Sequence, residues 1–169
     1  RATDSLAPSM RLAFVTHRAL PQLSDDDRLA VGELQQQGVT VESAVWDSPL
    51  VDWTRYDSIV VRSTWDYHLR RDAFLRWCDR VGRESRLFNP PALVRWNTDK
   101  HYLADLDAAG VPVVPTRFVE PENDPDTDAE PLAALDAFLA AHHDVAGFVV
   151  KPAISAGSHD TWRYRREQT

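Results

Sequence analysis

Short apolar segments alternate with amphipathic ones through the first half of the chain. The predicted strands are Leu12–Thr16, Val39–Trp46, Ile59–Val61 and Arg86–Phe88. A helix is predicted from a Ser24 cap, through an acidic first turn, to a stop at Gly38, and a second over Arg71–Glu84. Strands and helices that alternate in this way form a parallel sheet covered by helices. The sequence therefore predicts a small α/β domain over residues 10–95, with residues 1–9 as an extension.

A second unit, α+β in character, is predicted over residues 96–169. Its first helix is capped by Asn97 or Thr98 and ends at Gly110. An extended, proline-containing segment follows, and the acidic stretch Glu120–Pro131 predicts a mobile loop. Further along we expect an amphipathic helix from Leu132 to about His143, a strand that ends at Lys151, and Thr161–Arg165 as the hairpin partner of that strand.

The strand that ends at Lys151 leads into a loop of small residues. A lysine in this place, before residues that let backbone N–H groups approach an anion, suits a nucleotide phosphate. An ammonium group buried after three apolar residues would be costly, and a phosphate would offset that cost. The alternative is a lysine that reaches solvent before an ordinary turn, because a single glycine makes a weak phosphate loop.

Composition excludes several classes of function. The net charge of −7 argues against a general nucleic-acid binder, whose phosphate contacts need a basic surface. A single cysteine, Cys78, allows no disulfide and no cysteine-based zinc site, and we expect it to be a buried thiol in a reducing cytoplasm. No apolar run approaches the ~20 residues that cross a membrane. We expect no nucleic-acid partner and no membrane partner.

Polar and aromatic residues follow the first and third predicted strands. Ligands of parallel sheets gather at the carboxyl ends of strands, so these residues form a candidate substrate site. Arg62 could pair with a substrate carboxylate, while Trp65 and Tyr67 could wall the pocket. The alternative is a loop whose aromatic rings pack on the core and whose Asp66 caps a turn. The predicted substrate-binding residues are His17, Arg62, Ser63, Thr64, Trp65, Asp66 and Tyr67.

The second unit resembles the ATP-grasp superfamily of ligases. The resemblance lies in Asn97–Lys100, in Gly110–Thr116 and in Val149–Pro152 with the loop that follows. It implies a parallel-sheet pre-ATP-grasp domain followed by an incomplete ATP-grasp subdomain. It also implies that Lys100 and Lys151 bind ATP, and that the loop Ala153–His159 covers the phosphates. The loop residues in contact with ATP would be Ser155, Ala156, Gly157 and Ser158.

An early position in a helix independently favours a ligand for Lys100, because a cation there opposes the helix dipole. Further upstream, Val61–His68, Phe88–Pro90 and Arg95–Lys100 are similar to the group that contains O-ureido-serine cyclo-ligase, which closes the ring in cycloserine biosynthesis. Glutathione synthetase is a more distant relative in the same superfamily.

The resemblance implies an enzyme that activates a small amino-acid-like carboxylate as an acyl-phosphate for attack by an amine. ATP and Mg²⁺ would be its cofactors. The family holds Mg²⁺ on late strands that nothing in this sequence matches, so we predict no catalytic residue and no metal ligand here. The chain then reads as the N-terminal part of a ligase, inactive alone, whose exposed sheet edge could pair copies into a homo-oligomer.

Two alternatives stay open beside the ligase fragment. The chain could be a short homologue that binds a nucleotide or another small molecule without catalysis. It could also be an unrelated α/β module in which Lys100 and Lys151 are incidental.

Overall fold

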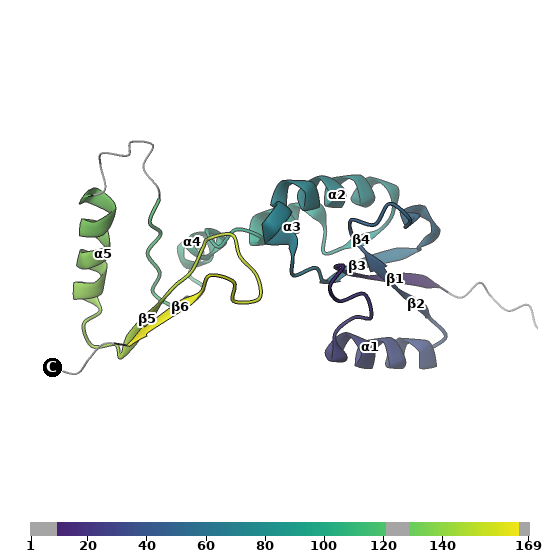
Figure 1. Ribbon diagram of the computed structural model, residues 1–169, viewed down its shortest axis with the longest axis horizontal. Coiled ribbons are helices and arrows are strands. Elements are labelled where there is room, and N and C mark those ends of the chain that lie inside the picture. The colour runs from purple at the N-terminus through teal and green to yellow at the C-terminus, as the bar shows by residue number, and fades with distance from the viewer. Residues whose placement is uncertain (1–9, 121–128, 166–169) are drawn as a thin grey trace, which may run out of the picture. The chain divides into compact units, whose positions relative to one another are not determined.

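The computed structural model describes residues 10–120 and 129–165 and divides the chain into two compact units, Arg1–Thr98 and Asp99–Thr169 (Figure 1). The division lies just beyond the boundary predicted after residue 95. Each unit is described by itself. Within the described residues, no helix combines the length and the apolar character needed to span a membrane.

The first unit is built on a four-stranded sheet. Its strands are β1 (Arg11–Thr16), β2 (Thr40–Val45), β3 (Ser58–Ser63) and β4 (Leu87–Phe88), in the order β2-β1-β3-β4. All neighbouring pairs are parallel, which confirms the predicted parallel sheet. The pairing of β1 with β3 shifts register between Val15 and Thr16, so the irregularity lies at the carboxyl ends of the two central strands.

Helices cover both faces of this sheet (Figure 1). The helix α1 (Asp25–Gln36) lies on one face, while α2 (Arg71–Glu84) and α3 (Pro91–Asn97) lie on the other. Ser24 caps α1 as predicted, because its hydroxyl accepts a hydrogen bond from the Asp27 N–H at 3.2 Å. Short 3₁₀ turns, η1 (Trp53–Arg55) and η2 (Tyr67–Arg70), lead into β3 and α2.

The larger core lies between the sheet and α2 and is rich in aromatic rings. Trp77 stacks on Phe74 at 5.6 Å and meets Trp53 edge-on at 5.1 Å. Cys78 is fully buried beside them, as predicted, and desolvation raises the pKa of its thiol to about 12. The smaller core, around Leu12, Phe14 and Leu23, lies under α1. Burial on both faces explains why β1 and β3 are apolar runs rather than alternating ones.

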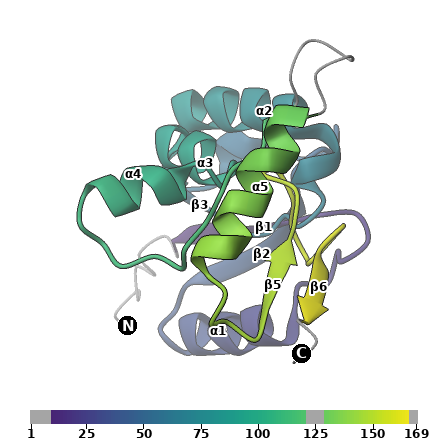
Figure 2. The same ribbon diagram turned by 90° about the vertical axis from the view of Figure 1, so that its left-hand side faces the viewer.

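The second unit contains α4 (Tyr102–Ala108), α5 (Ala129–Ala141) and a hairpin of β5 (Gly147–Val150) and β6 (Trp162–Arg165). The strands are antiparallel and run side by side, which confirms the predicted hairpin (Figure 2). The rings of Phe148 and Tyr164 stack across it at 5.1 Å. A side chain at Gly147 would collide with the Tyr164 carbonyl oxygen, so the close approach of the two strands requires glycine there.

Two boundaries differ from those expected. Asn97 ends α3 and Thr98 caps that end, so neither begins the next helix, which starts at Tyr102. The Thr98 hydroxyl donates to the Arg95 carbonyl at 3.1 Å and accepts from Arg71 Nε at 3.0 Å, which commits it to the preceding helix.

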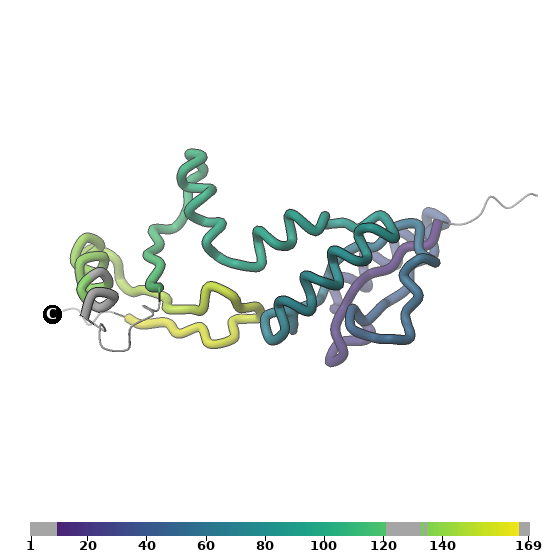
Figure 3. Tube along the Cα trace, turned by 90° about the horizontal axis from the view of Figure 1, so that it is seen from above, coloured from purple at the N-terminus to yellow at the C-terminus, as the bar shows by residue number. Residues whose placement is uncertain are grey.

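Two further predictions for this unit concern the extended segment after α4 and the loop before α5. Val111–Val119 belongs to no strand, and the chain continues from it toward Glu120 (Figure 3). Most of the loop predicted over Glu120–Pro131 lies outside the described residues. The prediction of a loop was wrong for its last three residues, 129–131, because α5 already begins at Ala129.

Candidate functional site

In the first unit, the segments that follow β1, β2 and β3 are tied together at one edge of the sheet. The chain passes from β1 to β2 on one side and then crosses back to β3 on the other side, since β1 lies between these two strands. Such a switch point, at the carboxyl ends of the strands, is where α/β sheets bind ligands. His17 follows β1, Asp47 lies after β2, and Thr64–Asp66 follow β3.

His17 links the first and third strands. Its Nδ1 lies 2.7 Å from the carbonyl oxygen of Ser63, and its ring lies 6.2 Å from the Trp65 ring at a tilt of 50°. Thr16 and Ser63 are buried on either side of this contact. The structure therefore brings His17 together with Ser63 and Trp65.

Arg62 faces a carboxylate of the chain itself. Its Nη2 and Nε lie 2.6 and 2.7 Å from Asp27 Oδ1, and the Ser63 hydroxyl donates to the other oxygen of Asp27. Burial raises the pKa of Asp27, but hydrogen bonds from Ser63, Arg62 and Ser24 outweigh it and hold that pKa below its ordinary value. Arg62 is thus fixed in place, with part of its donor set already used.

Sequence reasoning missed Asp27 for a physical reason. Asp27 is the third residue after the Ser24 cap, in an acidic first turn, and its position is fully accounted for by capping. Only the tertiary fold shows that its side chain, 3% exposed, reaches β3.

The residues after Trp65 divide between core and edge. Tyr67 packs against Phe74 at 5.7 Å and so serves the core, as the alternative interpretation expected. Trp65 is 49% exposed and available to a ligand. Asp66 makes no side-chain capping bond and instead accepts a hydrogen bond from Trp46 Nε1 at 2.9 Å. Thr64 is buried.

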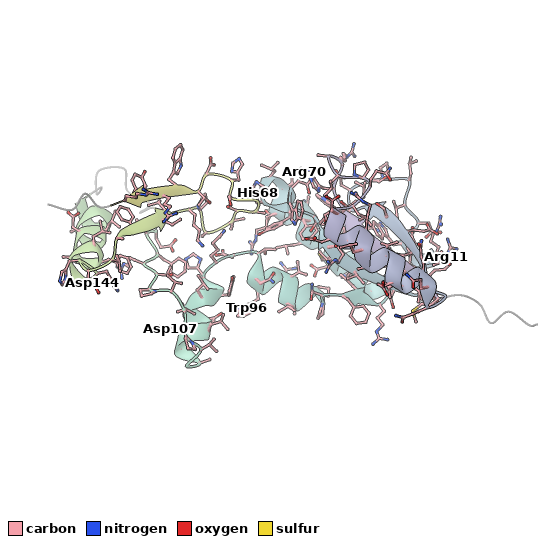
Figure 4. All side chains as sticks on the ribbon, turned by 90° about the horizontal axis from the view of Figure 1, so that it is seen from below. Arg11, His68, Arg70, Trp96, Asp107 and Asp144 are labelled. Carbon is pink, nitrogen blue, oxygen red and sulfur yellow. The ribbon has the colours of Figure 1, made fainter. Side chains whose placement is uncertain are left out.

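Three more charged residues join this edge, and the sequence alone did not single them out. Asp47 lies 3.1 Å from Arg18 Nε and 2.7 Å from Arg70 Nη2. Burial raises the pKa of Asp47, while hydrogen bonds from Arg70 and Arg18 lower it by more. Arg70 also stacks over Trp46 at 4.8 Å and lies toward the opposite end of the unit from Arg11, the residue that opens β1 (Figure 4).

We name two separate sets of ion pairs at this edge the carboxyl-edge cluster: Arg62 with Asp27, and Arg18, Asp47, Arg70 and Asp66 with one another. Its three arginines and three aspartates are matched by ion pairs within the cluster. Formal charges therefore cancel at this edge. A cluster of this kind suits a ligand with little net charge, such as a zwitterionic amino acid, better than a polyphosphate.

The second unit brings Lys100 and Lys151 together from distant parts of the sequence. Lys100 Nζ donates to the carbonyl oxygens of Ala153 and Ser155 at 3.2 and 3.1 Å, and its N–H donates to Ala153 at 2.9 Å. Desolvation, and then the charge of Lys151, lower the pKa of the Lys100 ammonium. The two cations thus lie within electrostatic reach of each other, beside the loop that was expected to bind phosphate.

Two details of these lysines differ from the prediction. Lys100 lies in the turn before α4 and not in a helix, so the helix dipole does not explain it. Lys151 is exposed at the end of β5, so no burial penalty needs to be offset. Their expected role in binding ATP stays a prediction.

The loop Ala153–His159 is folded by its own hydrogen bonds. The His159 N–H donates to Ala156 at 3.0 Å, and the Ser155 hydroxyl donates to His159 at 3.0 Å. Gly157 and Ser158 both have positive φ, 59° and 60°. Their N–H groups donate to no acceptor in the residues that the structure describes, and both residues are exposed. Successive free amides in such a conformation can bind an anion.

His101, next to Lys100, carries an interaction that the sequence did not predict. Its Nδ1 lies 2.6 Å from Asp99 Oδ1, its Nε2 lies 2.7 Å from Glu120 Oε1, and its ring stacks on Phe118 at 4.1 Å. Hydrogen bonds to Asp99 and Glu120 raise the pKa of the imidazole. Across the described parts of the chain, no group of three histidine, cysteine or acidic side chains is arranged to hold a metal ion.

Comparison with known proteins relates the chain to proteins of cycloserine formation. A family model described as the N-terminal domain of D-cycloserine synthetase DcsG matches residues 12–89. The cycloserine biosynthesis protein DcsG of Streptomyces lavendulae is 46% identical over 155 residues, which are 92% of this chain and 50% of that protein. The crystal structure of D-cycloserine synthetase DcsG matches with a TM-score of 0.76 at 41% identity, and again covers 92% of this chain and 50% of the other.

The chain is thus a homologue of the N-terminal part of DcsG, and it spans about half the length of that curated relative. The predicted similarity to a protein of cycloserine biosynthesis is confirmed. The ATP-grasp assignment and the roles of individual site residues stay predictions.

Proposed function

We propose that this chain supplies the substrate-binding and part of the nucleotide-binding apparatus of an ATP-dependent ligase. The ligase joins an amino-acid-like carboxylate to an amine or a related nucleophile. The homology to a D-cycloserine synthetase supports this proposal, since the name of that relative describes the synthesis of a small cyclic molecule derived from an amino acid.

The observation that carries the proposal is the contrast in charge between two groups of residues. In the second unit, Lys100 and Lys151 lie within electrostatic reach of each other, and Lys100 contacts the loop that carries the free amides of Gly157 and Ser158. Two cations and free N–H groups suit the phosphates of ATP. In the first unit, the charges of the carboxyl-edge cluster cancel, which suits a zwitterionic substrate.

Each residue then has a definite role. Lys151 reaches the phosphates directly, while Lys100 holds the loop carbonyls of Ala153 and Ser155 and so sets the position of the free amides. In the first unit, Arg62 is positioned by Asp27, with Trp65 as an exposed flat surface beside it in the sequence. Mg²⁺, which ATP chemistry of this kind requires, would be held mainly by the ATP phosphates and by ligands beyond this sequence.

Calorimetric titration with Mg-ATP tests the proposal. We expect Lys151→Ala to weaken binding by ten-fold or more, which corresponds to about 1.4 kcal/mol. Arg117→Ala is the matched control, because Arg117 is also an exposed cation of the second unit, and it should leave the affinity unchanged. Absence of Mg-ATP binding by the folded, complete gene product would refute the ligase assignment. Equal affinities of Lys151→Ala and wild type would refute the role of this lysine.

A further inference from the structure

The protonation of His17 follows from its contact with Ser63. Nδ1 lies 2.7 Å from a backbone carbonyl oxygen, which can only accept a hydrogen bond. Nδ1 must therefore carry the proton. A neutral imidazole has one N–H group, so Nε2 of the neutral ring is a bare acceptor.

Buried neighbours fix the orientation of this imidazole. The Ser63 carbonyl belongs to the last residue of β3, and the Ser63 hydroxyl is held by Asp27. On the other side, Thr16 Oγ1 donates to the Leu20 carbonyl at 2.8 Å and lies 3.4 Å from the same Ser63 oxygen. Ser63, which supplies the acceptor of the His17 bond, is thus held from both α1 and β1.

The other nitrogen, Nε2, is left open to a ligand. Among the residues that the structure describes, Nε2 has no hydrogen-bond partner. The half-exposed ring of Trp65 lies beside the imidazole and offers a flat apolar surface. Since the charges of the carboxyl-edge cluster are already matched, what this edge offers beside Trp65 is an open acceptor rather than an unpaired charge.

We propose that His17 Nε2 is the acceptor for an N–H group of a small amino-acid-like ligand whose body lies against Trp65. This proposal rests on the proposed function and deepens it, because it assigns the recognition of the substrate's nitrogen to one atom. His17 acts here as a binding and positioning residue.

The tautomer is the first test and needs no ligand. The ¹⁵N NMR signals of a protonated and a bare ring nitrogen are well separated, so a chain labelled in its histidines reports the tautomer of the neutral ring. We expect a proton on Nδ1. A proton on Nε2 would overturn the proposal, because the bare acceptor would then not exist.

Ligand binding is the second test, with D-cycloserine and D-serine as probes and propanoate, which lacks N–H groups, as the control ligand. We expect the first two to shift the Nε2 signal and propanoate to leave it unchanged. If neither D-cycloserine nor D-serine shifts it, the proposal is wrong.

Two variants separate this role from a structural one. The side-chain amide of His17→Asn can occupy the place of Nδ1 and keep the bond to Ser63, but it removes the Nε2 acceptor. We expect it to retain the urea midpoint of the wild type and to bind the stronger probe at least ten-fold more weakly. His17→Gln places an amide oxygen near Nε2 and should recover part of the affinity.

Wild-type affinity in a folded His17→Asn chain would overturn the proposal. None of these measurements contains ATP, so their outcome is independent of the Lys151 titration. Failure of the His17 proposal and failure of the ligase proposal can therefore be told apart.

Discussion

Asp27→Asn should destabilise the first unit by about 2–5 kcal/mol, because Asp27 satisfies two donors from β3 at once. Its two oxygens accept separately from Ser63 and Arg62. The amide of asparagine keeps the shape of the side chain but has only one acceptor oxygen, so its NH₂ group must face one of these donors.

The size of the effect follows from the burial of the two partners. Ser63 is 2% exposed, and a buried hydroxyl left without an acceptor costs about 1–3 kcal/mol. The Arg62 side chain is 42% exposed, so water replaces much of the lost ion pair and that contribution is about 0.5–1 kcal/mol. Loss of a negative charge in the first turn of α1 adds about 0.3–1 kcal/mol.

Urea unfolding followed by tryptophan fluorescence measures this effect, since Trp46, Trp53 and Trp77 are buried in the first unit. Asp26→Asn is the matched control: Asp26 lies in the same turn, is exposed and makes no contact with β3, so only the helix-dipole contribution is lost. If the two variants unfold within about 0.5 kcal/mol of each other, the reasoning about the buried acceptor is refuted.

The pH dependence provides a second check on the same reasoning. The pKa of Asp27 is lower in the folded chain than its ordinary value, so the stability it contributes is present above the unfolded pKa of about 3.9. That contribution is lost as the pH falls through the folded pKa. The difference in stability between wild type and Asp27→Asn should therefore be constant near neutral pH and shrink below about pH 4.

Three other outcomes are expected. Lys100→Met removes the donor to two loop carbonyls, so amide hydrogen exchange over residues 153–159 should become faster. Unchanged exchange would show that these hydrogen bonds do not hold the loop in place. Cys78 should resist iodoacetamide at about pH 8 in the folded chain and react in urea, because burial keeps its thiol protonated. In an NMR titration His101 should lose its proton above the ordinary histidine range. Glu120→Gln should lower the pKa of His101. The raised pKa contributes stability to the folded chain at low pH, and this stability is lost as the pH rises through the folded pKa of His101.

The first unit was largely predictable because its elements are determined locally. The apolar runs, the Ser24 cap and the amphipathic stretch of Arg71–Glu84 each specify an element from neighbouring residues, and the structure reproduces them within a few positions. The start of α4 was not predictable in this way. Asn97 and Thr98 have the side chains of a helix cap, but Thr98 bonds to Arg71 and Arg95, and the first of these contacts is known only from the tertiary structure.

The candidate site shows the same division between local and long-range information. Residues at strand ends, such as His17 and Trp65, can be found from the sequence, because the carboxyl edge of a parallel sheet follows from the strand assignments. The residues that pair with the strand-end residues cannot be found from the sequence. Asp27, Asp47 and Arg70 lie on three different elements, and each has an adequate local explanation as a cap residue or a solvated charge.

These partners change what the strand-end residues can do. An isolated Arg62 would be a free cation that seeks an anion, whereas the Arg62 of this fold is half of an ion pair with a buried aspartate. The charges on Asp47 and Asp66 are met in the same way by Arg18 and Arg70. With its formal charges paired internally, the first unit offers hydrogen bonds and shape rather than net charge, and His17 and Trp65 remain available for both. Under the proposed function, attraction of a polyanion would therefore fall to Lys100 and Lys151.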